Sequence, residues 1–161
     1  MNNKLNYPNW LVPLDIAKQL KEIGFNEPCL VTYHEVFDEE MIFISFEGDD
    51  YCYYYAELSE CSQRTNSEMG KDILETGKHY SYACSIPTWT DVFAWFRERG
   101  YESYIKLESH SHFDEGNYYY FEITEPNLYQ LDYQGNFDSY EEAREALVKA
   151  LIQTYKQEQL K

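Results

Sequence analysis

The sequence lacks the motifs that identify several familiar classes of protein. It has no run of about 18 apolar residues, so no segment is expected to span a membrane. Nucleotide-binding glycine loops, a G-x-S-x-G nucleophile motif and a calcium-binding EF-hand loop are also missing. The first residues contain no apolar signal-peptide core, and the four cysteines form no C-x-x-C pair. We therefore expect a cytoplasmic protein with reduced thiols, and we predict no cofactor.

Basic residues are scarce. The chain has 13 lysines and arginines against 29 aspartates and glutamates, which gives a net charge of -16. Proteins that bind nucleic acid draw much of their affinity from basic side chains that displace counterions. The tyrosine runs at 53–55 and 118–120 could stack on bases, but without a cationic groove they are better explained as ordinary sheet residues. Direct binding of nucleic acid is therefore not expected.

Aromatic residues are plentiful. They make up 18% of the chain, and 17 of them are tyrosines. Disordered acidic segments lack such residues, so this composition predicts a compact fold. A length of 161 residues suits one ordinary domain, and we predict a single domain over residues 1–161.

The first helix is predicted at Leu14–Ile23. Its apolar residues recur at the spacing of one helix face, Pro13 suits its start, and Gly24 suits a left-handed C-terminal cap. A second helix should follow Thr88, which forms a capping box with Asp91, and should end at Gly100.

The third helix should follow Ser139, which can pair with Glu142 in a second capping box, and Glu145 and Lys149 should form an ion pair on it. Residues 59–78 are polar and predict a loop with one short helical turn.

Strands are predicted from alternating apolar residues and turn residues. Short turns are expected at Asp38–Glu40 and Gly48–Asp50. The predicted strands are Leu30–Phe37, Met41–Glu47, Tyr51–Leu58, 79–86, Tyr101–Ser109, Asn117–Thr124 and a short edge strand at Leu128–Tyr133. Because short turns favour antiparallel pairing, we predict an α+β fold: a mainly antiparallel sheet with three helices packed on it.

Three stretches resemble one group of proteins. They are Ile23–Cys29, Ile86–Tyr101, which reads IPTWTDVFAWFRERGY, and Ser139–Ala143. Together they resemble small uncharacterised proteins encoded by bacteriophages and mobile elements of gut bacteria. The resemblance covers the three helices, and its motifs are packing and capping signals. It implies an accessory role in the cytoplasm of a bacterial host and assigns no catalytic residue.

Acidic residues are concentrated at 25–70, which we call the acidic segment. It holds eleven acidic side chains and one base, Arg64. Charges this dense are too costly to bury, so they should form a solvated surface that attracts cationic partners. We predict a non-catalytic protein that binds a basic protein, in one version by imitating nucleic acid. The predicted contact residues are Asp38, Glu39, Glu40, Glu47, Asp49, Asp50, Tyr51 and Tyr53.

The alternative is a metal site at Glu108, His110 and His112. These residues alternate along one strand direction, so their side chains could share one side, and imidazole and carboxylate groups bind zinc and related metals. The same residues also fit a polar turn between two strands. A small-molecule pocket at Trp89 or Trp95 is a third possibility, although core packing explains Trp89 better. Cys52 and Cys84 are expected to be buried structural thiols.

Overall fold

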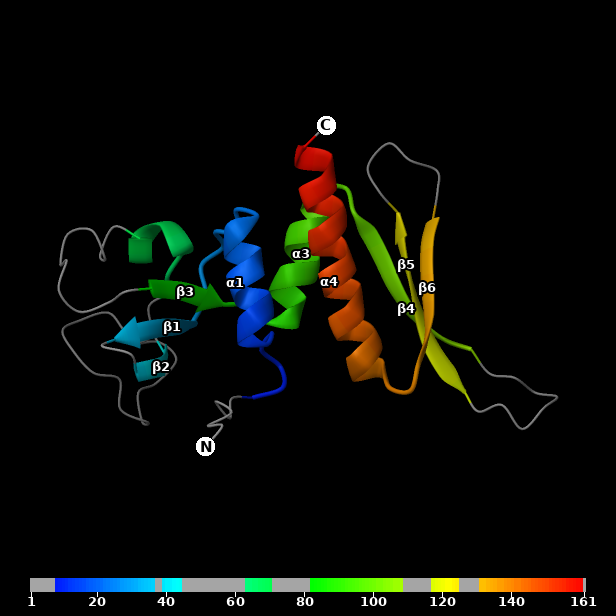
Figure 1. Cartoon of the computed structure of the whole chain (residues 1–161), viewed down its shortest axis with the longest axis horizontal. Helices are drawn as coiled ribbons and strands as arrows, with labels where there is room; N and C mark the ends of the chain where they lie inside the picture. Colours follow the sequence, from blue (N-terminus) through cyan, green and yellow to red (C-terminus); the bar gives the residue numbers. More distant parts are fainter. Residues whose placement is uncertain are drawn as a thin grey trace. The chain divides into compact units, whose positions relative to one another are not determined.

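The computed structural model shows an α+β fold, as predicted, with antiparallel sheets and packed helices (Figure 1). The chain divides into two compact units, residues 1–91 (unit 1) and residues 92–161 (unit 2). We describe each unit by itself. The structure describes residues 8–36, 39–44, 63–70, 82–108, 117–124 and 131–160.

Helix α1 of unit 1 spans Leu14–Glu22 and ends as its sequence predicts. Gly24 has a φ of 90°, in the left-handed region that favours glycine. Its N–H donates to the carbonyl of Lys21 (3.1 Å), and the N–H of Phe25 donates to the carbonyl of Leu20 (2.9 Å). This pair of bonds is the Schellman motif. The helix buries Ile16, Ala17 and Leu20.

The sheet of unit 1 has the order β2-β1-β3, with both pairs antiparallel. Its strands are β1 (Val31–Val36), β2 (Glu39–Ile44) and β3 (Tyr82–Ile86), and α1 contacts β3. One predicted turn is wrong: Glu39 and Glu40 lie in β2, opposite Val36 and Glu35. Glu39 and Glu40 of the expected turn therefore belong to the ladder, while Asp38 lies outside the described residues. The predicted strand at 51–58 lies outside the described residues.

A short helical segment at residues 66–70 lies in the predicted loop and is anchored through Thr65 and Asn66 at its start. Thr65 and Glu68 form a capping box: the Thr65 N–H donates to Glu68 Oε2 (2.8 Å), and the Glu68 N–H donates to Thr65 Oγ1 (3.2 Å). The buried Asn66 amide donates to the carbonyl of Phe25 (2.7 Å) and accepts from the N–H of Ser85 (3.0 Å). The segment is therefore fastened to both the α1–β1 connection and β3.

Helix α3 (Trp89–Glu98) begins in unit 1 and continues into unit 2. The predicted capping box is confirmed. Thr88 donates from its backbone N–H (3.0 Å) and from its hydroxyl (2.7 Å) to Asp91 Oδ2, and the Asp91 N–H donates to Thr88 Oγ1 (3.1 Å). At the other end, Gly100 has a φ of 87° and repeats the Schellman motif.

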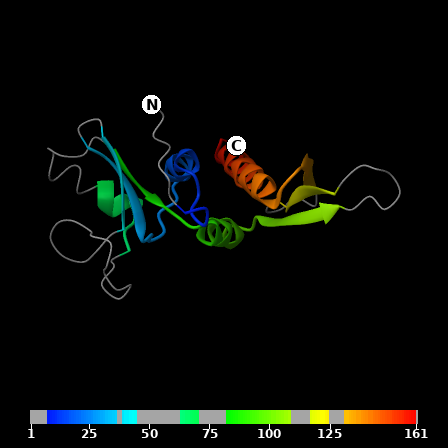
Figure 2. The ribbon, with the colours of Figure 1, turned by 90° about the horizontal axis from the view of Figure 1, so that it is seen from below.

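Unit 2 has a three-stranded antiparallel sheet of order β4-β5-β6, formed by β4 (Glu102–Glu108), β5 (Tyr118–Thr124) and β6 (Leu131–Phe137). Helix α4 (Tyr140–Gln159) lies along one face of this sheet (Figure 2). Phe121 and Ile123 of β5 are buried on that side, and the Phe121 ring stacks on Phe137 of β6 at 5.8 Å.

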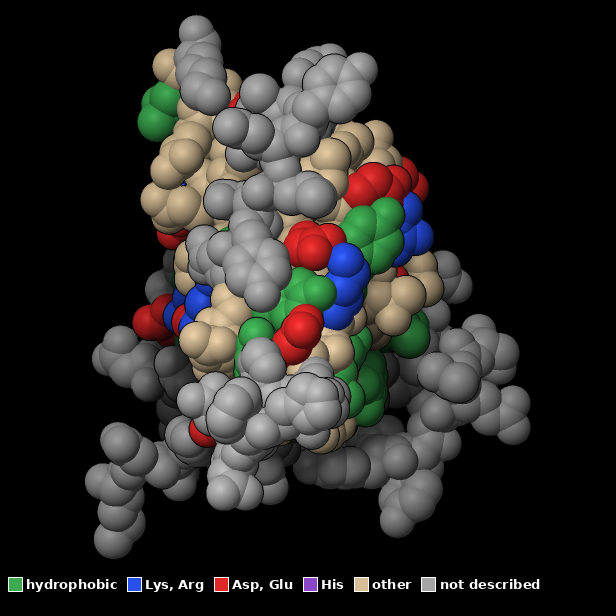
Figure 3. All heavy atoms as spheres, turned by 90° about the vertical axis from the view of Figure 1, so that its right-hand side faces the viewer, with side chains coloured by type: hydrophobic (Ala, Val, Ile, Leu, Met, Phe, Trp, Pro, Cys, Tyr) green, Lys and Arg blue, Asp and Glu red, His purple; other side chains and the backbone are tan. Residues whose placement is uncertain are grey.

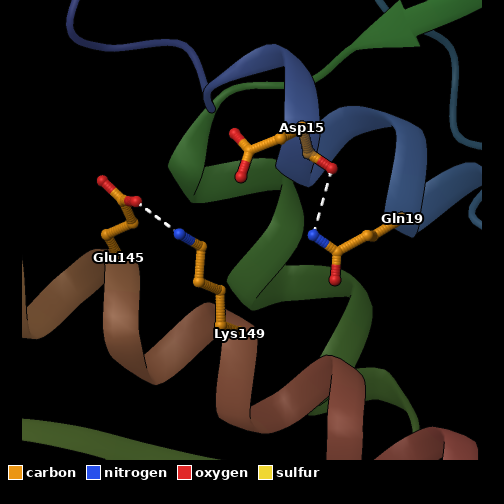
Figure 4. A network of polar contacts seen from close by, with 4 residues as sticks. All are labelled: Asp15, Gln19, Glu145 and Lys149. Atoms are coloured by element: carbon orange, nitrogen blue, oxygen red, sulfur yellow. Dashed lines mark hydrogen bonds and ion pairs between the residues drawn. The ribbon is translucent and has the colours of Figure 1, made fainter.

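The start of α4 and one ion pair on it follow the prediction. Ser139 Oγ accepts from the N–H of Glu142 (3.2 Å), although the Glu142 carboxylate accepts from Asp138 rather than from Ser139 itself. In the same helix Lys149 and Glu145 form the predicted ion pair, at 2.6 Å, and in α1 the Gln19 amide donates to the Asp15 carbonyl at 3.2 Å (Figure 4). The buried residues of α4 are Ala143, Leu147, Val148, Leu151, Ile152 and Thr154.

The prediction of one sheet is wrong for the described residues, because their strands form two sheets, one in each unit. Strand β1 pairs with β3, which lies more than 45 residues away in the sequence, so no short turn predicts that pairing. The edge strand expected at Leu128–Tyr133 continues to Phe137 as β6 (Leu131–Phe137), while residues 128–130 lie outside the described residues. The single-domain prediction for residues 1–161 stays a prediction.

Candidate functional site

The predicted acidic surface belongs to unit 1. That unit holds sixteen of the acidic side chains and six basic ones, which leaves it with a net charge of -10, while unit 2 carries -6. Of the predicted contact residues, Glu39 and Glu40 lie on β2. The other six, Asp38, Glu47, Asp49, Asp50, Tyr51 and Tyr53, lie outside the described residues, so the proposed contact remains a prediction.

Two basic side chains of unit 1 are held against aromatic rings. Lys18 Nζ lies 4.8 Å from the centre of the Tyr33 ring, and Lys21 Nζ lies 4.3 Å from the centre of the Tyr82 ring. Lys21 Nζ also donates to the carbonyl of Ala83 (2.5 Å), and burial lowers the pKa of Lys21. Both cations therefore serve the packing between α1 and the sheet.

The exposed sheet face of unit 2 has a different charge pattern. Lys106 on β4 pairs with Glu122 on β5 at 2.8 Å and lies 5.9 Å from the centre of the Tyr120 ring. Tyr104 on the same strand is 52% exposed. In Figure 3, which views the molecule from this side, acidic and basic side chains alternate among hydrophobic ones. This face is mixed in charge, in contrast to the acidic segment of unit 1.

The structure describes one of the three predicted metal ligands. Glu108 is half-buried at the end of β4, opposite Tyr118, whereas His110 and His112 lie outside the described residues. Within the described ranges, no group of three or more histidine, cysteine, aspartate or glutamate side chains is arranged to hold a metal ion. The metal site therefore stays a prediction.

Both described cysteines are buried, as predicted for Cys84. Burial raises the pKa of Cys84 to about 11 and that of Cys29 to about 12. Because a thiolate is the reactive form of cysteine, neither side chain is suited to nucleophilic attack at neutral pH. The other two cysteines, Cys52 and Cys61, lie outside the described residues. Trp89 is 8% exposed, which confirms the core packing predicted for it, and Trp95 is also buried, at 2%.

A pocket of about 210 Å³ lies entirely within unit 1, and we call it the Cys29 pocket. Its floor is made of buried apolar side chains, and its exposed rim includes Trp10, which is 50% exposed. The lining residues come from four separate segments of the chain. They are Trp10, Leu11, Pro28, Cys29, Leu30, Val31, Gln63, Ile86, Thr88 and Asp91.

Backbone pairing holds the walls of the Cys29 pocket together. Cys29 and Arg64 exchange two backbone hydrogen bonds, of 3.0 and 2.9 Å. On the other side, the Trp89 N–H donates to the Trp10 carbonyl (3.3 Å), and the Trp89 indole donates to the carbonyl of Asn9 (2.9 Å). The pocket is therefore formed by fixed backbone segments.

The Cys29 pocket is negatively charged. Asp91 is half-buried in its wall, and both Thr88 bonds end on its Oδ2 atom. Burial is the largest influence on the pKa of the Cys29 thiol, and the charges of Asp91 and Glu27 raise this pKa further. A cationic group would be stabilised beside these carboxylates.

Sequence reasoning missed this pocket. Two features near the pocket can be read from the sequence: Thr65 and Glu68 form a recognisable capping box, and Trp10 lies outside every predicted element. The juxtaposition of Trp10, Cys29 and Asp91 depends on pairings between distant segments, which no local pattern encodes.

Comparison with protein-family models, with curated proteins and with solved structures found no match to this chain. The resemblance to phage and mobile-element proteins therefore stays a prediction. Among the described residues, no helix has both the length and the apolar character needed to cross a membrane.

Proposed function

We propose that the chain is a non-catalytic accessory protein of a bacteriophage or mobile element, which acts in the cytoplasm of a bacterial host. It binds a basic protein through the acidic, tyrosine-rich surface of unit 1. The contact residues are Asp38, Glu39, Glu40, Glu47, Asp49, Asp50, Tyr51 and Tyr53. The observation that carries the proposal is the net charge of -10 on unit 1.

The placement of lysines on α1 supports this proposal. An acidic surface attracts a basic partner only if nearby cations do not neutralise it. Lys18 and Lys21 are two of the six basic side chains of unit 1, and both are held over tyrosine rings between α1 and the sheet. Both lysines are already counted in the net charge of -10, so the acid of unit 1 remains in excess of them.

The β1–β2 pair adds support, because it places part of the acidic segment on described strands of unit 1. Glu35 lies on β1, and Glu39 and Glu40 lie on β2, where the register sets Glu40 opposite Glu35 and Glu39 opposite Val36.

Charge also suggests what the partner is. Carboxylates spaced along strands can imitate the phosphates of nucleic acid, and tyrosines supply contact area at a small loss of conformational entropy. A protein that normally binds DNA or RNA has a complementary basic surface. In this version of the proposal, the chain occupies that surface and inhibits the partner.

The test is capture from bacterial lysate at low and high salt. The test variant combines Glu47→Gln, Asp49→Asn and Asp50→Asn, and the control variant neutralises three exposed acids of unit 2, Glu98, Glu102 and Glu141. We expect wild type and the control variant to retain a basic protein at low salt and to release it at high salt. The test variant should retain less of that protein at low salt. A wild-type protein that captures no salt-sensitive basic partner would remove the proposal.

A further inference from the structure

We propose that the Cys29 pocket is an anchor site that receives one arginine side chain of the basic protein partner. This inference rests on the proposed function, because it identifies the partner group that unit 1 recognises. It adds a defined site, built from described residues, to a surface proposed from charge alone.

The size of the pocket favours a single side chain. Its volume is about 210 Å³, which is below the range of roughly 300–1,000 Å³ typical of sites for drug-sized ligands. A nucleotide or an extended cofactor would not fit, whereas one long side chain would. Protein interfaces commonly use such pockets to hold an anchoring residue, and arginine is among the residues enriched there.

The lining suits a side chain with an apolar stem and a cationic head. Leu11, Val31 and Ile86 are at most 5% exposed and offer apolar contact to the stem. Trp10 at the rim offers an aromatic face, on which a guanidinium stacks favourably. Oδ1 of Asp91 offers an acceptor for the N–H groups of the head, since both Thr88 bonds end on Oδ2.

The electrostatic environment selects a cation over a neutral group of the same shape. Asp91 and Glu27 both act on Cys29 at the pocket floor, where their charges favour a positive neighbour. Arginine suits the site better than lysine because its planar head combines stacking with directed hydrogen bonds.

The backbone of the site is already in place without a partner. Leu11 forms a bridge with Thr88, and Cys29 forms one with Arg64, so the walls that carry Trp10 and Asp91 are fixed by main-chain bonds. A preformed pocket loses less conformational entropy on binding than a site that must assemble.

The test uses the whole protein and three blocked peptides, each with one central residue flanked by glycines. The central residue is arginine, citrulline or lysine; citrulline has the shape of arginine without its charge. Binding is followed by two-dimensional NMR of the Trp10 indole and the amides of residues 29–31. We expect the arginine peptide to shift these signals saturably, and the citrulline peptide to bind at least about fivefold more weakly, since hydrogen bonds to charged groups exceed neutral ones by this amount.

Two aspartate-to-asparagine variants, one at the pocket and one away from it, show where the arginine peptide binds. Asp91→Asn removes the charge at the pocket but keeps an oxygen that accepts from Thr88. Asp15→Asn removes an exposed charge on α1, a helix that contributes no residue to the lining. We expect Asp91→Asn to weaken the arginine peptide at least about fivefold, and Asp15→Asn to change it less than about twofold. Trp10→Leu should also weaken binding of the arginine peptide. Because Trp10 is half exposed, this variant should keep its fold.

Equal binding of arginine and citrulline peptides, or equal effects of the two aspartate variants, would overturn the anchor site. So would peptide binding that leaves the Trp10 signal in place. These outcomes are separate from the fate of the proposed function. If wild type captures a salt-sensitive basic protein and Asp91→Asn captures it equally well, the anchor site is wrong while the acidic surface stands. If no such protein is captured, the proposed function fails whatever the peptides show.

Discussion

Replacing Asn66 by alanine is expected to destabilise unit 1 by about 3 kcal/mol. The Asn66 side chain is 8% exposed and makes two hydrogen bonds to main-chain groups of distant segments, the carbonyl of Phe25 and the N–H of Ser85. Phe25 and Ser85 are both buried residues. Leaving one buried group without its partner costs roughly 1–3 kcal/mol, so two groups give a range of about 2–6 kcal/mol, and local relaxation favours its lower half.

The chain supplies a matched control in Asn26. Its Oδ1 accepts from the N–H of Ser67 at 2.7 Å, so Asn26→Ala deletes the same kind of bond. Asn26 is exposed, however, and water can replace its side chain at Ser67. We therefore expect Asn26→Ala to cost at most about 1 kcal/mol.

The assay is native-state hydrogen exchange of the β3 amides, which reports unit 1 separately from unit 2. Protection of the Ser85 amide should fall much further in Asn66→Ala than in Asn26→Ala. The same variant should also weaken the Cys29 pocket, because Asn66 holds the segment that follows Gln63 in place. Equal losses of protection in the two variants would refute the reasoning that burial, rather than the bond itself, sets the penalty.

Three further predictions follow from the same contacts. Trp95→Ala should destabilise unit 2 by about 3–5 kcal/mol in urea unfolding followed by near-ultraviolet circular dichroism, because Trp95 is 2% exposed and packs on Phe96 and Tyr155; Trp10→Ala, at a half-exposed site, should cost far less. Because burial raises the pKa of Cys29 from 9.0 to about 12, the thiol stays protonated in the folded chain while the unfolded chain ionises. The free energy of unfolding should therefore fall as pH rises from 9 towards 12, and Cys29→Ala should show a shallower fall. If Glu108, His110 and His112 bind metal, untagged protein should show a zinc-dependent rise in melting temperature that His110→Ala abolishes; an unchanged melting temperature would exclude the site.

Local signals made the helices predictable. Gly24 and Gly100 end α1 and α3 because each takes a positive φ that glycine adopts without strain. Thr88 with Asp91 and Ser139 with Glu142 mark helix starts because cap and partner lie within four residues. In every case the determining contacts fall within one or two turns of chain, so a sequence pattern contains them.

Long-range pairing accounts for what the sequence did not reveal. The division into two sheets depends on the pairing of β1 with β3 as well as with β2, and a long stretch of sequence separates β1 from β3. The acidic residues Glu39 and Glu40 suggested a turn because acids are common there, yet the register with β1 outweighed that preference. The Cys29 pocket arises from the same kind of distant pairing, between Cys29 and Arg64.

The salt dependence of binding to a captured partner tests the central claim most directly. The dissociation constant of the purified complex should be measured from low to high salt for wild type, for the triple variant at Glu47, Asp49 and Asp50, and for the triple variant at unit 2. The account predicts that wild type and the unit 2 variant weaken steeply and in parallel with salt, while the Glu47, Asp49 and Asp50 variant binds weakly at low salt and responds little. Parallel curves for all three proteins would contradict it.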